Sequence, residues 1–364
     1  MLKKSLLFER FRKFIDSIKK DDIVAVMHHT DSDGVCSGVI MAKVVERKRG
    51  KKVDLHINQK ACEIAVLNRT VEQLKRANVN KLIITDLGVD QAPSNIKEIE
   101  KFAEILVMDH HKIYANIDSK KTLFLKPQLV SQKNPAAYTA AKFCFDMASE
   151  ILDMSDLDWV AAVGLIGDCA FNLWKDFLEG VFSKYGIEKK ANIFETDLGK
   201  ASSIISDAEC FDSANAYKAF DIVYGSSSPS DVLKSELLKY HETVESETMY
   251  WMEHVNEFAE FIDDAIIYLI KPKYQIKPAL STRLSLKYSN KTIIILQDFG
   301  DGMIGISARR RDEKVAVNEL LEKATAGLER ANAGGHIPAA GGRIRKDDLS
   351  KFKDNLLHLV SKHG

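Results

Sequence analysis

The stretch that decides the fold is DIVAVMHHTDSDG, residues 22–34. Its first half, DIVAVM, is a short apolar run rich in β-branched residues, which is typical of a buried strand. Its second half is polar, and residues 35–47 then show the apolar spacing of a helix. A short strand that leads through a polar loop into a helix predicts the first strand–helix unit of a parallel sheet.

The same alternation continues through the first ~170 residues, which predicts a doubly wound parallel α/β sheet. The expected strands are residues 53–57, 81–85 and 104–108. The expected helices are residues 61–77, 94–102 and a largely buried helix at 157–170. We therefore expect an N-terminal domain over residues 1–180.

Strand patterns return in the last third of the chain, at AIIYLI, STRLSLKY, KTIIILQDF and GMIGISAR. A helix at residues 315–331, a glycine-rich loop and a final helix are expected to follow. This pattern predicts a smaller α/β domain over residues 265–364. The segment between, residues 181–264, is mostly helical in pattern, and we expect it to be a helical connector.

The composition is that of an ordinary globular protein. Hydrophobic residues make up 45% and charged residues 29% of the 364 positions, which argues against a disordered chain, a fibre or a membrane bundle. The first twenty residues are typical of an amphipathic helix and not of a signal peptide. Five cysteines are scattered and never spaced as CxxC, so we expect a reducing, cytoplasmic location. They are Cys36, Cys62, Cys144, Cys169 and Cys210.

The net charge of zero hides a gradient along the chain. Residues 265–364 hold 18 Lys and Arg against 10 Asp and Glu, whereas residues 181–264 hold 7 against 17. The basic third is suited to meet an anion with a short footprint. The acidic segment 181–264 is a natural docking surface for a protein partner. Two solvated surfaces with compensating charge explain the same counts equally well.

Four groups of Asp and His stand just past the ends of expected elements. They are residues 28–34, Asp86 in ITDLG, residues 109–111 in VMDHH, and Asp168 in LIGDCA. Because the carboxyl ends of parallel strands meet at one edge of a sheet, the first three groups are expected to converge there. Asp168 joins them if its helix packs alongside. Asp and His ligands without Cys favour Mn²⁺ or Mg²⁺.

A pair of metal ions is the chemistry that this set of residues suits. Two ions need a bridging carboxylate, for which Asp86 is the candidate, and such a pair activates water for attack at phosphorus. A single Asp after a strand is more often a helix cap than a ligand. Three strand ends that carry Asp or His together are harder to explain by capping alone, which favours the metal site.

These residues resemble a known family. The run His29-Thr30-Asp31-Ser32-Asp33-Gly34, the later Asp86 and above all Asp109-His110-His111 are similar to the motifs of the DHH phosphoesterase superfamily. The sequence GGHIPAAGG at residues 334–342, with Ser307-Ala308-Arg309, resembles the DHH-associated domain of RecJ-like exonucleases and nanoRNases. The resemblance covers about residues 22–175 and 265–350.

The resemblance implies a role for each matching position. One Mn²⁺ would be bound by His29, Asp31 and Asp86. The other would be bound by Asp33, Asp86, His110 and Asp168. His111 would polarise the scissile phosphate while Asp109 orients neighbouring imidazoles. The nucleotide or its phosphate would be held by Ser307, Arg309, Gly334, Gly335 and His336.

The implied function is a manganese-dependent exonuclease that releases nucleotides from single-stranded DNA or RNA ends in replication or repair. A nanoRNase, a 3′–5′ oligonucleotide phosphodiesterase and a partner-binding replication or repair scaffold are the alternatives. Polarity, sugar preference and oligomeric state stay open, and no membrane association is expected. Phe299, Tyr274 and Tyr288 are candidates for base stacking, although each also suits an ordinary core or surface position.

Overall fold

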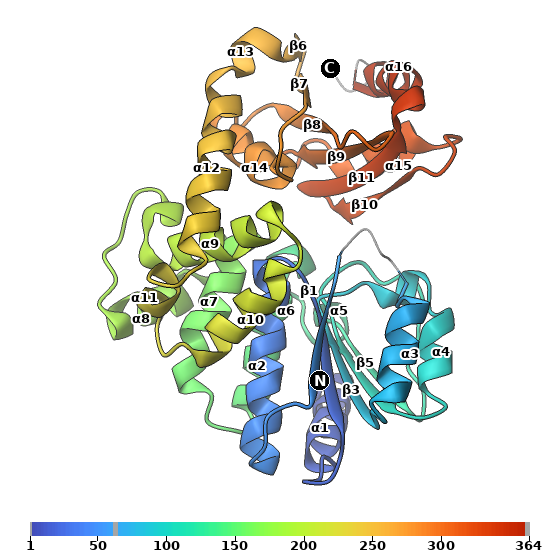
Figure 1. Cartoon of the computed structure of the whole chain (residues 1–364), viewed down its shortest axis with the longest axis vertical. Coiled ribbons are helices and arrows are strands. Elements are labelled where there is room, and N and C mark those ends of the chain that lie inside the picture. Colours follow the sequence, from blue (N-terminus) through green and yellow to red (C-terminus); the bar gives the residue numbers. More distant parts are fainter. Residues whose placement is uncertain (1, 61–64, 361–364) are drawn as a thin grey trace. The chain divides into compact units, whose positions relative to one another are not determined.

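A five-stranded parallel sheet, in the order β2-β1-β3-β4-β5, organises the first part of the molecule (Figure 1). Its strands are β1 (Val24–His29), β2 (Leu55–Gln59), β3 (Lys81–Thr85), β4 (Glu104–Met108) and β5 (Thr122–Leu125). The computed structural model describes residues 2–60 and 65–360 of the chain. Its contacts divide the chain into two compact units, Met1–His241 and Glu242–Gly364.

Helices cover both faces of this sheet. Val24 and Val26 of β1 point into one hydrophobic core, and Ala25 and Met27 point into the other, as the two-residue period of a strand requires. The first core packs under α1 (Leu2–Asp16), α2 (Ser32–Arg49), α6 (Ala140–Ser149) and α7 (Asp158–Gly167). The second packs under α3 (Asn68–Arg76) and α4 (Ser94–Ile99). The doubly wound parallel sheet is therefore confirmed.

Some boundaries differ from the expected ones. The strand expected at residues 53–57 begins at Leu55, because the Asp54 side chain accepts a hydrogen bond from the Val24 backbone N–H and pairs with Arg49. The helix expected at 61–77 begins at Asn68, and residues 61–64 lie outside the described ranges. Strand β5 has no counterpart among the expected strands.

The expected connector, residues 181–264, does not form a unit of its own. Its first helices belong to the first unit, because Leu198, Ala201 and Ile205 of α9 are buried in the same core as α7. The boundary between the units falls within α12. The helices of this region are α8 (Lys175–Tyr185), α9 (Asp197–Phe211), α10 (Asn215–Gly225), α11 (Pro229–Leu233), α12 (Leu238–Glu253) and α13 (Val255–Phe258).

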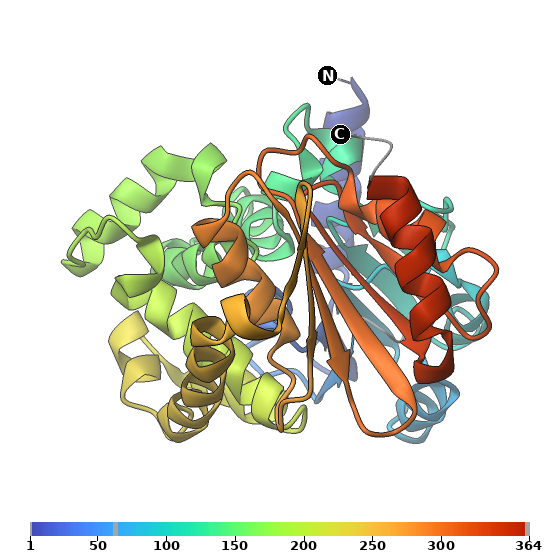
Figure 2. The same ribbon diagram turned by 90° about the horizontal axis from the view of Figure 1, so that it is seen from above.

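The second unit is built on a six-stranded mixed sheet in the order β10-β11-β9-β8-β7-β6, drawn in orange and red in Figure 2. Only β7 and β8 pair in parallel. Helices α15 (Val317–Thr325) and α16 (Leu349–Val360) pack on one face, and α14 (Lys277–Lys287) packs against β8 and β9. The strands are β6 (Glu260–Ile262), β7 (Ala265–Ile270), β8 (Thr292–Asp298), β9 (Met303–Arg309), β10 (Asn332–His336) and β11 (Ala339–Arg345).

Two expectations for this unit are wrong. STRLSLKY lies in helix α14 and its end, and not in a strand, because Leu280, Ser281, Leu284 and Ser285 are the residues it buries, which is helical spacing. The apparent two-residue alternation leaves Leu286 exposed. The glycine-rich segment is not a loop but the hairpin of β10 and β11.

Three further observations concern the chain as a whole. Within the described ranges, none of the helices combines the length and the hydropathy that crossing a bilayer requires. Four cysteines form no disulfide among the described residues, and Cys62 lies outside those ranges. The short helix α5 (Pro127–Val130) is separated from β5 by the single residue Lys126.

Candidate active site

The end of β1 and the start of α2 form the first part of the site. Asp31 caps α2 by accepting a hydrogen bond from the Gly34 N–H at 2.9 Å. His29 Nδ1 lies 2.9 Å from Asp31 Oδ2. A Cβ at Gly34 would stand 2.5 Å from the His29 carbonyl oxygen, so only glycine lets the helix begin this close to the strand.

Asp86 occupies the centre of the site, just past β3. Its carboxylate lies 3.5 Å from His29 Nδ1, 3.3 Å from His110 Nε2 and 3.9 Å from His111 Nδ1. The residue is buried and its backbone is left-handed, with φ of 57°, a conformation that Asp tolerates better than most side chains. This strained position turns the carboxylate toward both histidine groups, as a bridging ligand requires.

His110 gathers the remaining carboxylates. Its Nε2 lies 3.3 Å from Asp168 Oδ2 and 3.9 Å from Asp33 Oδ2. The Asp33 carboxylate also accepts hydrogen bonds from the backbone N–H groups of Ala140 and Ala141 at the start of α6, at 2.7 and 2.9 Å. Asp168 caps the C-terminal end of α7, so the structure brings it into the site from a helix, as the sequence allowed.

Charge crowding at this site is visible in the pKa values. Burial, together with the charges of Asp86 and Asp168, raises the pKa of Asp33 well above its usual value. Burial raises the pKa of Asp168 to about 6, despite the nearby His110. Burial opposes ionisation of Asp86 too, but hydrogen bonds from His110 and His29 outweigh it and lower its pKa. Three carboxylates around one buried imidazole are an arrangement that a bound cation stabilises.

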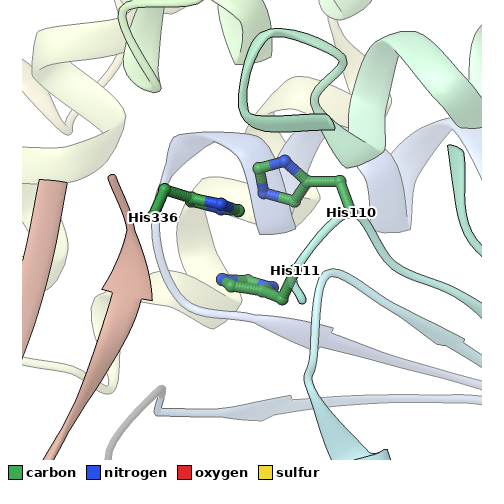
Figure 3. Close-up of side chains that lie close together, drawn as sticks. All are labelled: His110, His111 and His336. Atoms are coloured by element: carbon green, nitrogen blue, oxygen red, sulfur yellow. The ribbon is translucent and has the colours of Figure 1, made fainter. Parts of the chain in front are cut away.

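His111 belongs to a separate pair. Figure 3 shows the rings of His110 and His111 projecting from one loop, with centroids 4.8 Å apart. His111 Nδ1 lies 2.6 Å from Asp109 Oδ1, and the buried Asp109 also accepts a hydrogen bond from the His111 backbone N–H at 3.2 Å. Burial opposes both charges, yet their mutual attraction raises the pKa of His111 and, with Lys126, lowers the pKa of Asp109. Asp109 thus fixes the orientation of the His111 ring.

The sequence interpretation missed Lys126, which stands directly after β5. Its side chain is fully buried, and its Nζ lies 2.8 Å from Asp109 Oδ2 and 2.9 Å from Asp90 Oδ1. It also donates to the carbonyl oxygens of His111 and Lys112, at 3.1 and 2.9 Å. The sequence does contain a usable pattern, because Lys126 is a charged residue directly after an apolar run, as in the other four groups. The pattern was not recognised because the strand β5 was not predicted.

The donor set fits divalent cations. The ligand atoms of His29, Asp31 and Asp86 lie within 4.8 Å of one another, and so do those of Asp33, Asp86 and His110. The two groups share Asp86 and contain only carboxylate oxygens and imidazole nitrogens, which suit Mn²⁺ or Mg²⁺. Asp168 extends the second group through His110. All six expected ligands are therefore close together.

In the second unit, strand register aligns the expected substrate residues. Ser307 of β9 pairs with Gly341 of β11, which pairs with Gly334 of β10. Two residues further along β9, Arg309 pairs with Ala339 of β11, and Ala339 pairs with His336 of β10. These three residues form a second row. Directly paired residues point to the same side of a sheet, so these two rows share one face. Arg309 and His336 bring to this face the side chains that can bind an anion.

Individual contacts refine this face. Ser307 Oγ is buried and lies 2.9 Å from Ser281 Oγ of α14, while Gly335 takes a φ of 140°. Arg309 Nε is buried without a hydrogen-bond partner among the described residues. The next residue, Arg310, is buried and pairs with Asp312 at 2.6 Å.

A parallel sheet edged with carboxylates and imidazoles, followed by a mixed-sheet domain, defines a two-domain metal-binding class of protein. Two family models match this chain: "DHH family, N-terminal domain" over residues 23–165 and "DHHA1 domain" over residues 268–362. The chain therefore belongs to the DHH family of phosphoesterases and carries a C-terminal DHHA1 domain.

Three known proteins illustrate the similarity. An uncharacterized protein of Methanocaldococcus jannaschii is 28% identical over 211 residues, which cover 54% of this chain and 46% of the relative. RecJ of Thermus thermophilus in complex with Mn²⁺ has a TM-score of 0.68 at 17% identity, covering 99% of this chain and 54% of that one. Exonuclease RecJ bound to manganese has a TM-score of 0.65 at 17% identity, covering 98% and 94%. The chain spans about half the length of the first two, and the structural matches show the shared fold.

Proposed function

We propose that this protein is a manganese-dependent phosphodiesterase that removes nucleotides from an end of single-stranded DNA or RNA. The observation that carries the proposal is the convergence of six Asp and His side chains, from four separate segments, around Asp86. Similar folds described as RecJ contain Mn²⁺, and one of them is described as an exonuclease.

The metal ligands of this proposal are two overlapping sets. His29, Asp31 and Asp86 would hold one ion, and Asp33, Asp86, His110 and Asp168 the other, so that Asp86 is shared. When bound, such a pair supplies an activated water and stabilises charge on the oxygens of the phosphodiester. Mg²⁺ is compatible with the same donors.

The chain's own residues orient the phosphate and hold the protons. The Nδ1–H of His111 donates its hydrogen bond to Asp109 Oδ1. The other ring nitrogen, Nε2, is therefore the atom that would polarise the scissile phosphate. Lys126 holds the second oxygen of Asp109, so the carboxylate cannot rotate away from the ring. Asp109, His111 and Lys126 thus form one rigid positioning unit.

The second unit would bind the nucleotide. Arg309 offers a planar fork suited to two phosphate oxygens, and its buried Nε has no hydrogen-bond partner among the described residues. Ser307 and His336 flank it on the same sheet face. Gly334 carries no side chain on this face, so a ligand can approach the backbone of β10 closely, and Gly335 follows it with a φ of 140°.

The proposal is tested with a time course in Mn²⁺ on single-stranded DNA and RNA, each labelled at the 5′ or the 3′ end, beside a ladder of two to five nucleotides. Asp109→Ala is the inactive control. Mononucleotide released first from one end is the expected result, and it also gives polarity and sugar preference. Rapid loss of only the shortest RNA would indicate a nanoRNase. No metal-dependent cleavage of any substrate would refute the phosphodiesterase proposal.

A partner-binding scaffold is the second candidate, favoured by one observation on the acidic region. Residues 242–264 hold eight Asp and Glu and no Lys or Arg. Tyr250, Phe258 and Phe261 expose nearly half of their surface there. Such a surface suits a basic replication or repair protein with apolar anchors. The test is to replace these Asp and Glu residues with Lys and to repeat a pull-down whose partner has been identified. The scaffold candidate predicts that the partner is lost while nuclease activity is unchanged.

A further inference from the structure

A third row of residues continues the sheet face that carries Ser307 and Arg309. Gly305 of β9 pairs with Arg343 of β11, which pairs with Asn332 of β10. This row lies two residues from the Ser307 row and four from the Arg309 row, so its side chains point to the same side. The Arg343 row is therefore displaced from the Arg309 row by ~13 Å along the strands.

An aromatic ring lies over this third row. Phe299 directly follows β8, and a Cβ added at Gly305 would stand 2.6 Å from its Cζ and 2.7 Å from its Cε2. Only glycine at 305 leaves room for the ring. Phe299 is half-buried, so part of the ring is open to solvent. The sequence marks it as a stacking candidate but gives no reason to prefer that role over an ordinary core position.

Two cations flank the same ring. The Arg343 guanidinium carbon lies 5.5 Å from the ring centroid and Lys277 Nζ lies 6.0 Å from it. Lys277 is the first residue of α14, and its backbone N–H donates to Gln297 Oε1 at 3.1 Å. Gln297 pairs with Gly305, so the same sheet row fixes the position of Lys277.

On this face α14 packs against β8 and β9, so a ligand would reach the ring and its cations from the side of β11. The apolar side chains of β9, Ile304, Ile306 and Ala308, point to the other face, where α15 and α16 cover them. At Gly341, between the Arg309 row and the Arg343 row, an added Cβ would have no neighbour closer than 3.6 Å. Arg343 pairs with Asp301 at 2.8 Å, but that pair is exposed and such pairs are weak, so a phosphate can replace it.

We propose that Phe299, Arg343 and Lys277 form a further nucleotide subsite, which binds a nucleotide beyond the first two of the strand whose terminal phosphate Arg309 holds, because the two rows lie ~13 Å apart. Its base stacks on the Phe299 ring, and its phosphate is held by Arg343 and Lys277. The inference rests on the proposed function, because it extends the same substrate along the sheet face. Tyr288, another ring candidate, does not fit: its hydroxyl donates to Asn256, and its ring packs edge-on against Phe261.

The test measures binding and turnover separately, for a dinucleotide and for a pentanucleotide. Equilibrium binding is followed by fluorescence anisotropy of labelled oligonucleotides, and turnover by product release in Mn²⁺. Phe299→Ala and Arg343→Ala are compared with matched controls in the same unit. Phe261→Ala removes an exposed ring from the edge strand β6, and Lys323→Ala removes an exposed cation from α15 on the opposite face.

Phe299→Ala and Arg343→Ala are each expected to weaken binding of the pentanucleotide about tenfold and to raise its KM by a similar factor, with kcat unchanged. The dinucleotide and both controls are expected to change less than about twofold, which is the scatter of near-neutral surface substitutions. Equal losses on both lengths would mean that Phe299 serves the terminal nucleotide or the fold, and no loss would mean that the subsite does not exist. Either result overturns the inference. If the wild-type protein binds the oligonucleotides, and the two substitutions weaken binding of the pentanucleotide alone, but no substrate is hydrolysed, then only the proposed activity is refuted.

Discussion

The two units of this protein assemble their candidate sites in different ways. In the first, polar side chains leave the ends of β1, β3, β4 and α7 and converge on one point at a sheet edge. In the second, side chains stand in rows across β9, β11 and β10, set two residues apart by strand register. The first arrangement crowds buried charge into a small volume, whereas the second spreads contacts along a surface.

This difference predicts how each site responds to substitution. A crowded centre shares ligands, so losing one of them disrupts all of its functions together. A face of separate rows binds an extended ligand in steps, so each loss should be partial and confined to affinity. The predictions below go from the largest expected effect to the smallest.

Asp86→Asn is expected to lower kcat by at least ~10³, because it removes the carboxylate that both ligand groups share. Asn tolerates the left-handed backbone at this position, so the fold should survive. The measurements are turnover in Mn²⁺ and bound manganese per chain, which should also fall. Asp221→Ala, which alters an exposed carboxylate of the same unit, is the control. Wild-type activity in Asp86→Asn would refute the shared ligand.

Lys126→Met is expected to lower kcat by ~10² and to destabilise the first unit by ~3–5 kcal/mol, because it leaves the buried carboxylates of Asp90 and Asp109 without their cation. The matched control is Lys142→Met, at a second buried lysine, which pairs with Asp146 and packs over Trp174. Both variants should melt earlier, but only Lys126→Met should lose turnover per folded molecule. Equal turnover in the two variants would reduce Lys126 to a purely structural role.

The sequence predicted the first site better than the second for a physical reason. Strand ends in a parallel sheet meet at one edge whatever the exact strand boundaries are. The wrong boundaries predicted for the elements at residues 53–57 and 61–77 therefore did not change the predicted positions of Asp86 and His110. The six expected ligands consequently lie together in the structure. Lys126 was missed because its strand, β5, is only four residues long and gave no clear pattern.

The second unit depended on information that a local pattern does not hold. The glycine-rich segment was expected to be a loop, since glycine is common in loops, and only its pairing with β9 shows that it is a hairpin. The alternation in STRLSLKY matched a strand, yet burial of Leu280 and Leu284 selects a helix. The alignment of Phe299 with Gly305 and Arg343 follows from register, which is a property of the folded sheet.

Arg309→Ala is expected to raise KM about tenfold and to leave kcat within twofold at saturation, because it removes a phosphate contact made equally in the ground and transition states. Arg309→Lys should recover part of the affinity, since an ammonium supplies charge without the planar fork. Lys353→Ala on α16 is the control for loss of a partly exposed cation, which pairs with Glu260. A fall in kcat with unchanged KM would place Arg309 in the chemistry and contradict the contrast between the units.

The smallest expected effect concerns salt. Two phosphates, one held by Arg309 and one held jointly by Arg343 and Lys277, predict that log Kd for a short single strand changes with log salt with a slope of about 1.4, since each neutralised phosphate contributes roughly 0.7. Arg309→Ala should lower that slope by about 0.7. Lys126→Met should leave it unchanged, because its charge is buried against Asp90 and Asp109 and faces no ligand. Binding titrations of a pentanucleotide at several salt concentrations give the slopes. A slope that falls equally in both variants would mean that both units hold the strand by charge, and the division between a centre for chemistry and a face for binding would fail.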